Sequence, residues 1–261
     1  MILVTGATGF VGQKIMQMCK DAVACPSLRG ASEEEIRRII EESGADTIIH
    51  TAAISDTGVC QKNPEDSYLA NVQLPVSLAR AAKGVKLICF SSDQVYTGTE
   101  CSGPYTEADA KPGNIYAEHK LEMEQRVLDI APEAIMLRAE WMYDRYLKKS
   151  NYFMNILNAV DTVSFSSRQY RGLTYVKEVA ENMDVVIRMP GGVYNFGSET
   201  TKSMYEITAD FLALIGKDIR LDDVPPRHNL WMNCDKARKF GVTFRSVEDG
   251  LRQCAIDHGV I

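Results

Sequence analysis

The sequence has 261 residues, of which 45% are hydrophobic and 25% are charged, and this composition excludes disordered, collagen-like and coiled-coil proteins. With 29 Lys and Arg against 35 Asp and Glu, the net charge is −6. Since there is also no basic block, nothing favours nucleic acid or an anionic membrane as a partner. No apolar run approaches the roughly 20 residues that span a bilayer, and the N-terminus lacks the features of a signal peptide. We therefore expect a cytoplasmic protein without a membrane partner.

Cysteines are spread along the whole chain, at Cys19, Cys25, Cys60, Cys89, Cys101, Cys234 and Cys254. Their number is odd, they include no Cys-x-x-Cys pair, and no His stands at metal-ligand spacing. We expect reduced thiols that are mostly buried as small hydrophobic side chains, and no metal site.

Short apolar runs alternate with segments of helical period through the first 140 residues, as in parallel strands joined by crossover helices. The runs predict strands at 1–4, 22–25, 47–51, 86–90 and 134–138. The intervening segments predict helices at 10–20, after the capping box of Ser32 and Glu35, from Pro64 through Pro75 to about residue 82, and at 114–130. The fold class is therefore α/β, with a doubly wound parallel sheet.

Beyond residue 138 the alternation loosens, aromatic residues are scattered and the elements shorten. Ser203 with Glu206 predicts the start of a helix that ends near Gly216, and Ser246 with Asp249 predicts the start of a last helix. We expect a second, smaller lobe here.

A glycine-rich turn, TGATGFVG, lies directly between the first predicted strand and the first predicted helix. Its glycines, Gly6, Gly9 and Gly12, allow a tight turn and a close backbone approach to a pyrophosphate, while the helix N-terminus offers N–H groups and a positive dipole. In this position the motif predicts a Rossmann dinucleotide site.

The end of the second strand normally distinguishes the two nicotinamide dinucleotides, because an acidic residue there holds the ribose 2′-OH of NAD. Here the stretch is CPSLR, with a hydroxyl and Arg29 but no acid. A cation favours a 2′-phosphate, so we expect NADP, with NAD possible. The alternative is that Arg29 is only a solvated loop charge.

Hydroxyl and basic side chains follow in the pattern of an acid catalyst. Ser91 and Ser92 come at the carboxyl edge of the predicted sheet, where open α/β sheets bind ligands. Tyr116 and Lys120 are four residues apart and so share one helical face. A neighbouring ammonium and a cationic nicotinamide would bring the phenol pKa toward 7, which lets Tyr116 protonate a carbonyl oxygen during hydride delivery.

Four segments in this order, TGATGFVG, HTAA, SSDQVY and YAEHK, resemble those of an extended short-chain dehydrogenase/reductase over the whole chain. Within that group the chain most resembles the dTDP-4-dehydrorhamnose reductase family, which reduces a keto group on a nucleotide-linked sugar with NAD(P)H. The resemblance implies that Ser92, Tyr116 and Lys120 form the catalytic set. Tyr116 and Lys120 are also expected to bind the cofactor, with Lys120 on the nicotinamide ribose. The expected cofactor site further includes Thr8, Phe10, Val11, Thr51, Ala52, Ala53, Asn71 and Ser91.

The predicted lobe departs from the family pattern in three places, of which the last is the late R-P-x-N-S-x-L stretch, present here as PRHNLWM with Arg227. The R-T-S-W-V-Y stretch of the family appears as RAEWMY, which puts Glu140, a carboxylate that would repel a phosphate, in place of serine. The D-Q-x-G-x-P-T stretch appears as RQYRGLT. The expected substrate-binding residues are Asp93, Trp141, Arg171 and Arg227. The two arginines either pair with a diphosphate or are surface charges, and Trp141 either lies against the sugar or fills the interface.

We therefore expect a Rossmann dinucleotide-binding domain of residues 1–138 and 168–197, with a small discontinuous C-terminal substrate lobe of residues 139–167 and 198–261. The expected function is an NAD(P)H-dependent reductase acting on the keto group of a nucleotide-linked sugar, with a homodimer possible. One alternative is an epimerase on the same fold. The other is a non-catalytic NADP-binding regulatory subunit resembling the methionine adenosyltransferase beta subunit.

Overall fold

The computed structural model describes residues 1–100, 102–145 and 151–261. Its centre is a six-stranded sheet in which every neighbouring pair of strands is parallel. In spatial order the strands are β2 (Ala22–Ala24), β1 (Ile2–Thr5), β3 (Thr47–His50), β4 (Lys86–Ser92), β5 (Ile135–Ala139) and β9 (Gly192–Phe196). The strand order reverses at β1, which is the place where open α/β sheets bind ligands.

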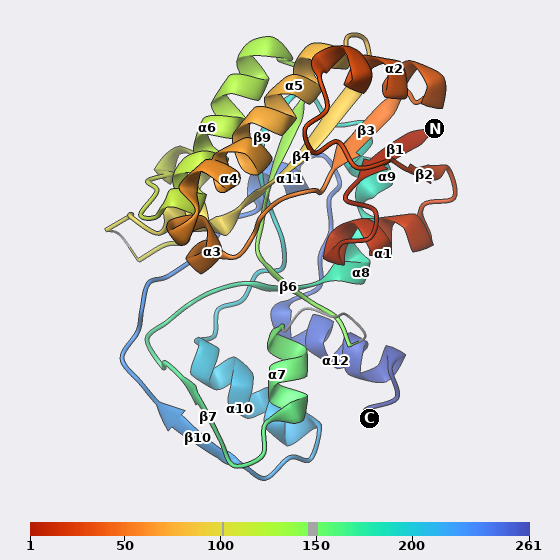
Figure 1. The fold of residues 1–261 in the computed structure, drawn as a ribbon. Helices are drawn as coiled ribbons and strands as arrows, with labels where there is room; N and C mark the ends of the chain where they lie inside the picture. The colour runs from red at the N-terminus through yellow and green to blue at the C-terminus, as the bar shows by residue number, and fades with distance from the viewer. Residues whose placement is uncertain (101, 146–150) are drawn as a thin grey trace.

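Helices cover both faces of this sheet (Figure 1). One face packs against α1 (Phe10–Met18), α8 (Val176–Glu181) and α9 (Met183–Ile187). The other side carries α2 (Glu33–Ser43), α3 (Thr57–Lys62), α4 (Pro64–Tyr68), α5 (Leu74–Ala81) and α6 (Ile115–Ile130). The predicted doubly wound Rossmann fold is therefore confirmed.

The remaining elements form a lobe below the carboxyl edge of the sheet in Figure 1. It contains α7 (Tyr152–Asn158), α10 (Met204–Leu214) and α12 (Val247–Asp257), with two parallel strand pairs, β6 (Trp141–Tyr143) with β8 (Leu173–Tyr175) and β7 (Thr162–Phe165) with β10 (Arg220–Asp223). Its core is rich in buried aromatic side chains, among them Tyr152, Phe153 and Phe211. Between β10 and α12 the chain returns to the sheet. There, Ala237 of α11 (Asp235–Arg238) and Val242 join the core beside β9.

Most predicted elements are present, with three differences. Strand β4 runs two residues further than predicted, because Ser91 and Ser92 pair with the end of β5. The sequence analysis missed strand β9, the short strands of the lobe and the short helices α3, α7, α8, α9 and α11, since these elements show little periodicity. The predicted helix through Pro75 contains a π-helical turn at Leu69–Gln73, directly before that proline. A proline has no N–H to donate to the preceding turn, so the regular hydrogen-bond ladder is interrupted there.

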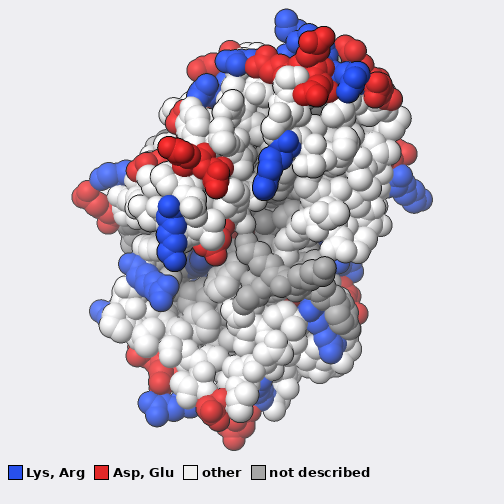
Figure 2. All heavy atoms as spheres, in the orientation of Figure 1, with Lys and Arg blue, Asp and Glu red and all other residues white. Residues whose placement is uncertain are grey.

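Charges and thiols agree with the sequence-based expectations where the structure describes them. Lys, Arg, Asp and Glu side chains are intermixed on the face shown in Figure 2, with no patch of one sign. The six described cysteines are free, and four of them are buried; Cys101 lies outside the described residues. Among the described helices, none is long and apolar enough to cross a membrane.

Candidate active site

A cavity of about 1430 Å³ runs along the carboxyl edge of the sheet, from the glycine-rich turn to the lobe. Most of the predicted site residues line it, namely Gly6, Thr8, Gly9, Phe10, Val11, Arg29, Thr51, Ala52, Ala53, Ser91, Ser92, Asp93, Tyr116, Lys120, Trp141 and Arg171. The tertiary structure thus brings the predicted cofactor-binding residues and the predicted catalytic residues to one cavity. Three predicted site residues do not line the cavity, namely Gly12, Asn71 and Arg227, and the position of each is described below.

The glycine-rich turn forms one end of this cavity. Gly6 has a φ of +66°, and a Cβ there would lie 2.8 Å from the backbone nitrogen of Ala52. A Cβ on Gly12 would lie 2.2 Å from the Gly6 carbonyl oxygen, so Gly12 allows α1 to pack against the turn rather than facing the cavity. Gly9 is the N-cap of α1 and offers no side-chain acceptor to the first N–H groups of the helix. A phosphate could therefore reach these N–H groups, so the turn fits a dinucleotide.

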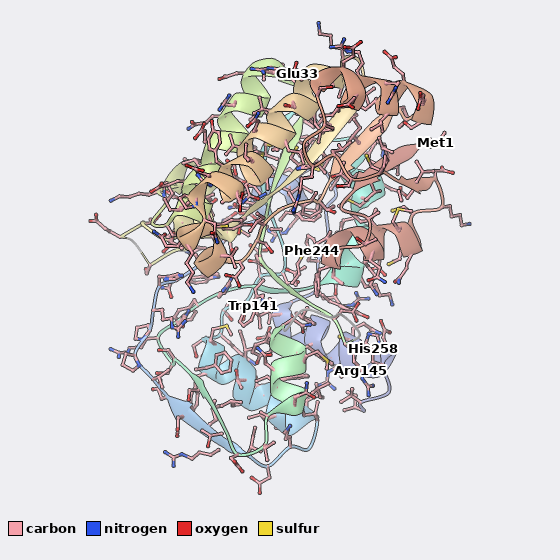
Figure 3. All side chains as sticks on the ribbon, viewed as in Figure 1. Met1, Glu33, Trp141, Arg145, Phe244 and His258 are labelled. Atoms are coloured by element: carbon pink, nitrogen blue, oxygen red, sulfur yellow. The ribbon has the colours of Figure 1, made fainter. Side chains whose placement is uncertain are left out.

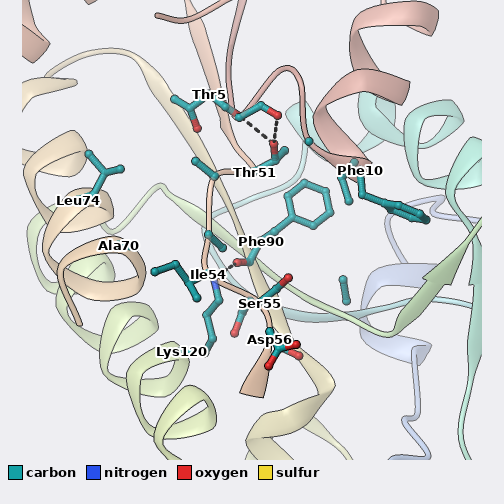
Figure 4. Close-up of a pocket in the computed structure, with 18 of the residues that line it drawn as sticks. Thr5, Phe10, Thr51, Ile54, Ser55, Asp56, Ala70, Leu74, Phe90 and Lys120 are labelled. Carbon is teal, nitrogen blue, oxygen red and sulfur yellow. Dashed lines mark hydrogen bonds between the residues drawn. The ribbon is translucent and has the colours of Figure 1, made fainter. Parts of the chain in front are cut away.

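The segment after β3 forms the neighbouring wall (Figure 4). Thr51 Oγ1 donates to the Thr5 carbonyl oxygen at 2.7 Å, which ties this segment to β1. Asn71 lies behind the wall, where its Nδ2 donates to the Ile54 carbonyl at 2.9 Å and its Oδ1 accepts from the Ile54 N–H at 3.2 Å. Asn71 is fully buried and belongs to the π-helical turn. It therefore shapes the wall from outside the cavity.

The third wall follows the short strand β2. Ser27, Leu28 and Arg29 all line the cavity, and Arg29 is solvent-exposed. Within the stretch from residue 24 to residue 31 that lines the cavity, no residue is acidic. A cation and a hydroxyl are therefore available here, where a carboxylate would be needed to hold a free ribose 2′-OH.

Ser92, Tyr116 and Lys120 meet at the middle of the cavity. Ser92 ends β4, and its hydroxyl lies close enough to the Tyr116 phenol to influence the pKa of that group. Tyr116 lies in the first turn of α6, which Asn114 caps by accepting from the Ala117 N–H. One turn later, Lys120 Nζ lies 5.8 Å from the Tyr116 ring centroid and donates to the Phe90 carbonyl oxygen at 2.8 Å. Figure 4 shows this lysine reaching from α6 toward the strand.

Burial dominates the electrostatics of this group. It raises the pKa of Tyr116 well above its ordinary value, although the interaction with Ser92 opposes the shift. It lowers the pKa of Lys120 to about 8. The protein alone therefore does not bring the phenol pKa toward 7, because the desolvation penalty exceeds the effect of the neighbouring ammonium. What the site holds at neutral pH is a protonated phenol beside a cationic lysine.

A cross-lobe ion pair closes the other end of the cavity. Arg171, just before β8, donates to Asp93 Oδ2 from Nε at 3.1 Å and from Nη2 at 2.8 Å, and its guanidinium lies 5.1 Å from the Trp141 ring centroid. The other carboxylate oxygen, Asp93 Oδ1, accepts from the Ser92 hydroxyl at 3.1 Å. Arg171 is thus held by Asp93 and Trp141, and through Asp93 it is linked to Ser92.

Glu140 does not act as the repelling carboxylate that its sequence position suggests. It is buried, and Thr174 donates to its Oε2 at 3.0 Å. A Cβ on Gly172 would lie 1.9 Å from Oε1 and one on Gly197 would lie 2.3 Å from Oε2, so these two glycines make room for the carboxyl. Burial, together with nearby Asp93, raises the pKa of Glu140 well above its ordinary value, which favours the neutral acid.

The sequence motifs did not show that Arg227 lies outside the cavity, and they did not identify three of the residues that line it. Arg227 is exposed and outside the lining of the cavity. Conversely, Gln94, Ser77 and Met142 line it without having been predicted. Gln94 directly follows the SSD segment and could have been inferred from its place after β4. Ser77 and Met142 carry no sequence signal, since only the packing of α5 and β6 turns them toward the cavity.

Comparisons with known proteins agree with this geometry. The family model described as the RmlD substrate binding domain matches residues 1–229. Methionine adenosyltransferase 2 subunit beta of Xenopus tropicalis is 31% identical, over 94% of this chain and 83% of that protein. The spore coat polysaccharide biosynthesis protein SpsK of Bacillus subtilis is 25% identical over 78% of this chain and 76% of its own.

Solved structures show the same fold. A dTDP-4-dehydrorhamnose reductase of Clostridium acetobutylicum superposes with a TM-score of 0.86 at 22% identity, covering 100% of this chain and 99% of its own. The enzyme of the same name from Bacillus anthracis, in complex with NADP, gives 0.86 at 20% identity over 98% of both chains. The predicted resemblance is therefore confirmed, and the chain belongs to the family described as the RmlD substrate binding domain.

Proposed function

We propose that this protein is an NADPH-dependent reductase that acts on the keto group of a nucleotide-linked sugar. The observation that carries the proposal is the meeting of Ser92, Tyr116 and Lys120 in the same cavity that begins at the glycine-rich turn. A cavity of about 1430 Å³ is large enough for a dinucleotide together with a second ligand, since ordinary ligand pockets are about 300–1,000 Å³.

The residues fit NADP. Gly6, Gly9 and the open N-terminus of α1 would hold its pyrophosphate, and Arg29 with Ser27 would hold the 2′-phosphate. Related structures support this choice, because the Bacillus anthracis reductase is in complex with NADP and the RMD protein of Pseudomonas aeruginosa is complexed with NADPH. Bound in this way, the reduced nicotinamide would supply the hydride for the carbonyl carbon.

The chain's own residues would supply the proton and orient the carbonyl. Tyr116 holds its proton, since burial raises its pKa, and would donate it to the substrate oxygen as charge develops there. Ser92 would hydrogen-bond the same oxygen, and its orientation depends on Asp93. The ammonium of Lys120, fixed on the Phe90 carbonyl, would stabilise the phenolate that is left.

A titration of the purified protein with NADPH and NADH, followed by absorbance at 340 nm with a panel of nucleotide 4-ketosugars, tests the proposal. We expect tighter binding of NADPH and its stoichiometric consumption with one of the sugars. Turnover of a sugar without net consumption of the cofactor would contradict a reductase and indicate the epimerase alternative. Failure to bind either dinucleotide would overturn the assignment of the glycine-rich turn.

A non-catalytic regulatory subunit is the second candidate, favoured by the 31% identity to methionine adenosyltransferase 2 subunit beta. Both candidates predict dinucleotide binding, so turnover separates them. Binding of NADPH without consumption on any sugar of the panel would favour the regulatory subunit. The presence of Ser92, Tyr116 and Lys120 in the lining of one cavity favours the enzyme.

A further inference from the structure

A cluster of metal-ligating side chains lies outside the candidate active site, where the last helix of the lobe meets the sheet domain. Asp144, Cys254 and His258 each direct one ligand atom toward the others, and these atoms all lie within 4.8 Å of one another. Figure 3 shows His258 beside Arg145, the residue that follows Asp144, at the junction of the two parts. None of the three residues lines the cavity that holds Tyr116.

The backbone explains why these side chains meet. Cys254 and His258 are four residues apart at the C-terminal end of α12, so they project from the same helical face. Asp144 directly follows β6 and approaches this face from the other side. His258 Nε2 lies 2.7 Å from Asp144 Oδ1, and the side chains of Asp144 and His258 are 3% and 13% exposed. The sequence analysis missed this cluster because Asp144 lies 114 positions from His258 in the chain, and only the tertiary structure brings the two together.

The donor set matches one class of ion. A thiolate sulfur, an imidazole nitrogen and a carboxylate oxygen are ligands that Zn²⁺ prefers, with bonds of about 2.0–2.3 Å in tetrahedral sites. Those bond lengths place neighbouring ligand atoms about 3.3–3.7 Å apart. In the cluster, His258 Nε2 and Asp144 Oδ1 are 2.7 Å apart, and no pair of ligand atoms is more than 4.8 Å apart. Shifts of about 1 Å would therefore complete the geometry.

The surroundings also suit a bound cation. Lys14 of α1 donates to Asp144 Oδ2 at 2.7 Å, which leaves Oδ1 turned toward His258 and fixes the orientation of the carboxylate. Such a partner on the outer oxygen is typical of ligating carboxylates in metal sites. A thiolate and a carboxylate together would balance the charge of a divalent ion, and the Lys14 ammonium would add one positive charge beside the site.

We propose that Asp144, Cys254 and His258 form a zinc site with water as the fourth ligand. The site would connect α12 and the segment after β6 and, through Lys14, reach α1, whose N-terminus faces the candidate cofactor cavity. Its role would be to hold the lobe against the sheet domain. This inference is independent of the proposed reductase activity.

Direct metal binding tests the proposal on the untagged full-length protein. Calorimetry with Zn²⁺ should show one equivalent bound, and Co²⁺ should produce a thiolate charge-transfer band with visible bands of tetrahedral intensity. Since Zn²⁺ binds the folded state, saturation should also raise the melting temperature. The cobalt spectrum requires no variant, so it reports on Cys254 even if substitution there prevents folding.

Variants assign the ligands. Cys254→Ser, His258→Gln and Asp144→Asn should each weaken Zn²⁺ binding by more than about 100-fold, beyond the 10- to 100-fold effect of losing a supporting partner. The matched controls are Cys19→Ser and His228→Gln, which lie outside the cluster and should leave the affinity unchanged. Absence of stoichiometric binding, or binding that these three variants leave intact, would overturn the proposal and leave the cluster as a hydrogen-bonded ion pair.

Discussion

At the scale of single residues, the proton donor is the most specific assignment. Tyr116→Phe removes the phenol hydroxyl but keeps the buried ring, which is 6% exposed. We expect kcat to fall by at least about 100-fold, since this is the low end of what a positioned general acid contributes, while the affinity for NADPH changes little. The control is Tyr68→Phe, because Tyr68 bonds Glu122 and Arg126 outside the cavity. An unchanged rate in Tyr116→Phe would remove this residue from the mechanism.

The charge of Lys120 should give the enzyme its pH dependence. Burial lowers the pKa of this lysine from 10.5 to about 8, so the ammonium is lost as the pH rises through about 8. We expect kcat/KM to fall above that pH, because this parameter reports the ionisation of the free enzyme. The folded state releases this proton before the unfolded chain does, so the contribution of Lys120 to stability should rise between about pH 8 and 10.5.

Both effects can be measured with one variant. Lys120→Met lacks the titrating group, so its free energy of unfolding should lack the rise that the native protein shows between pH 8 and 10.5. A kcat/KM profile of the native protein that stays flat up to pH 10 would show that the neutral amine suffices.

At the scale of elements, the π-helical turn sets the position of the cavity wall. Asn71→Ala would leave the Ile54 N–H without its side-chain acceptor, and the Ile54 carbonyl would keep only the weak thiol donor Cys60. We expect a loss of about 1–3 kcal/mol in the free energy of unfolding, the usual cost of unpaired buried polar groups, and weaker NADPH binding. Denaturant titration and fluorescence measure the two effects.

The same helical region supplies a control. Asn63→Ala removes an exposed amide that contacts only its own helix in the described contacts, and it should change stability by less than about 0.5 kcal/mol. Equal losses in both variants would mean that Asn71 has no special role in bracing the wall.

At the scale of the whole molecule, ion pairs join the lobe to the sheet domain. Arg171→Met would leave Asp93, which is 2% exposed, without its cationic partner. We expect a loss of about 3 kcal/mol in the free energy of unfolding, the low end for breaking a buried pair. The double variant Arg171→Met with Asp93→Asn should recover part of this loss, because the unpaired charge is gone.

The exposed Arg168 lies three residues away on the same segment and is the matched control, with an expected change below about 0.5 kcal/mol for Arg168→Met. Denaturant unfolding measures the free energy lost in each variant. If the loss in the double variant equals the sum of the losses in Arg171→Met and Asp93→Asn, the two residues are not coupled.

Local patterns were enough to predict the fold class and most of the cavity. The glycine-rich turn, the strand and helix periodicities and the four-residue spacing of Tyr116 and Lys120 are short-range features, because each depends on backbone geometry within a few residues. For this reason Gly6, Gly9, Ser92, Tyr116 and Lys120 could be predicted as site residues from the sequence, and the structure brings them to one cavity. The same reasoning placed Gly12 in the turn. It could not show that Gly12 allows α1 to pack against the turn and does not line the cavity.

Only the tertiary structure decided which distant side chains meet. Arg171 pairs with Asp93 across 78 positions, Asn71 supports Ile54 from outside the cavity, and Arg227 stays exposed. Glu140 becomes a buried acid because Gly172 and Gly197 leave space for it. The Arg171 pair depends on how the lobe meets the sheet edge, whereas the burial that shifts the pKa values of Tyr116 and Lys120 depends on how α6 packs against β4. Local sequence patterns carry no measure of either quantity, since both arise from residues far apart in the chain.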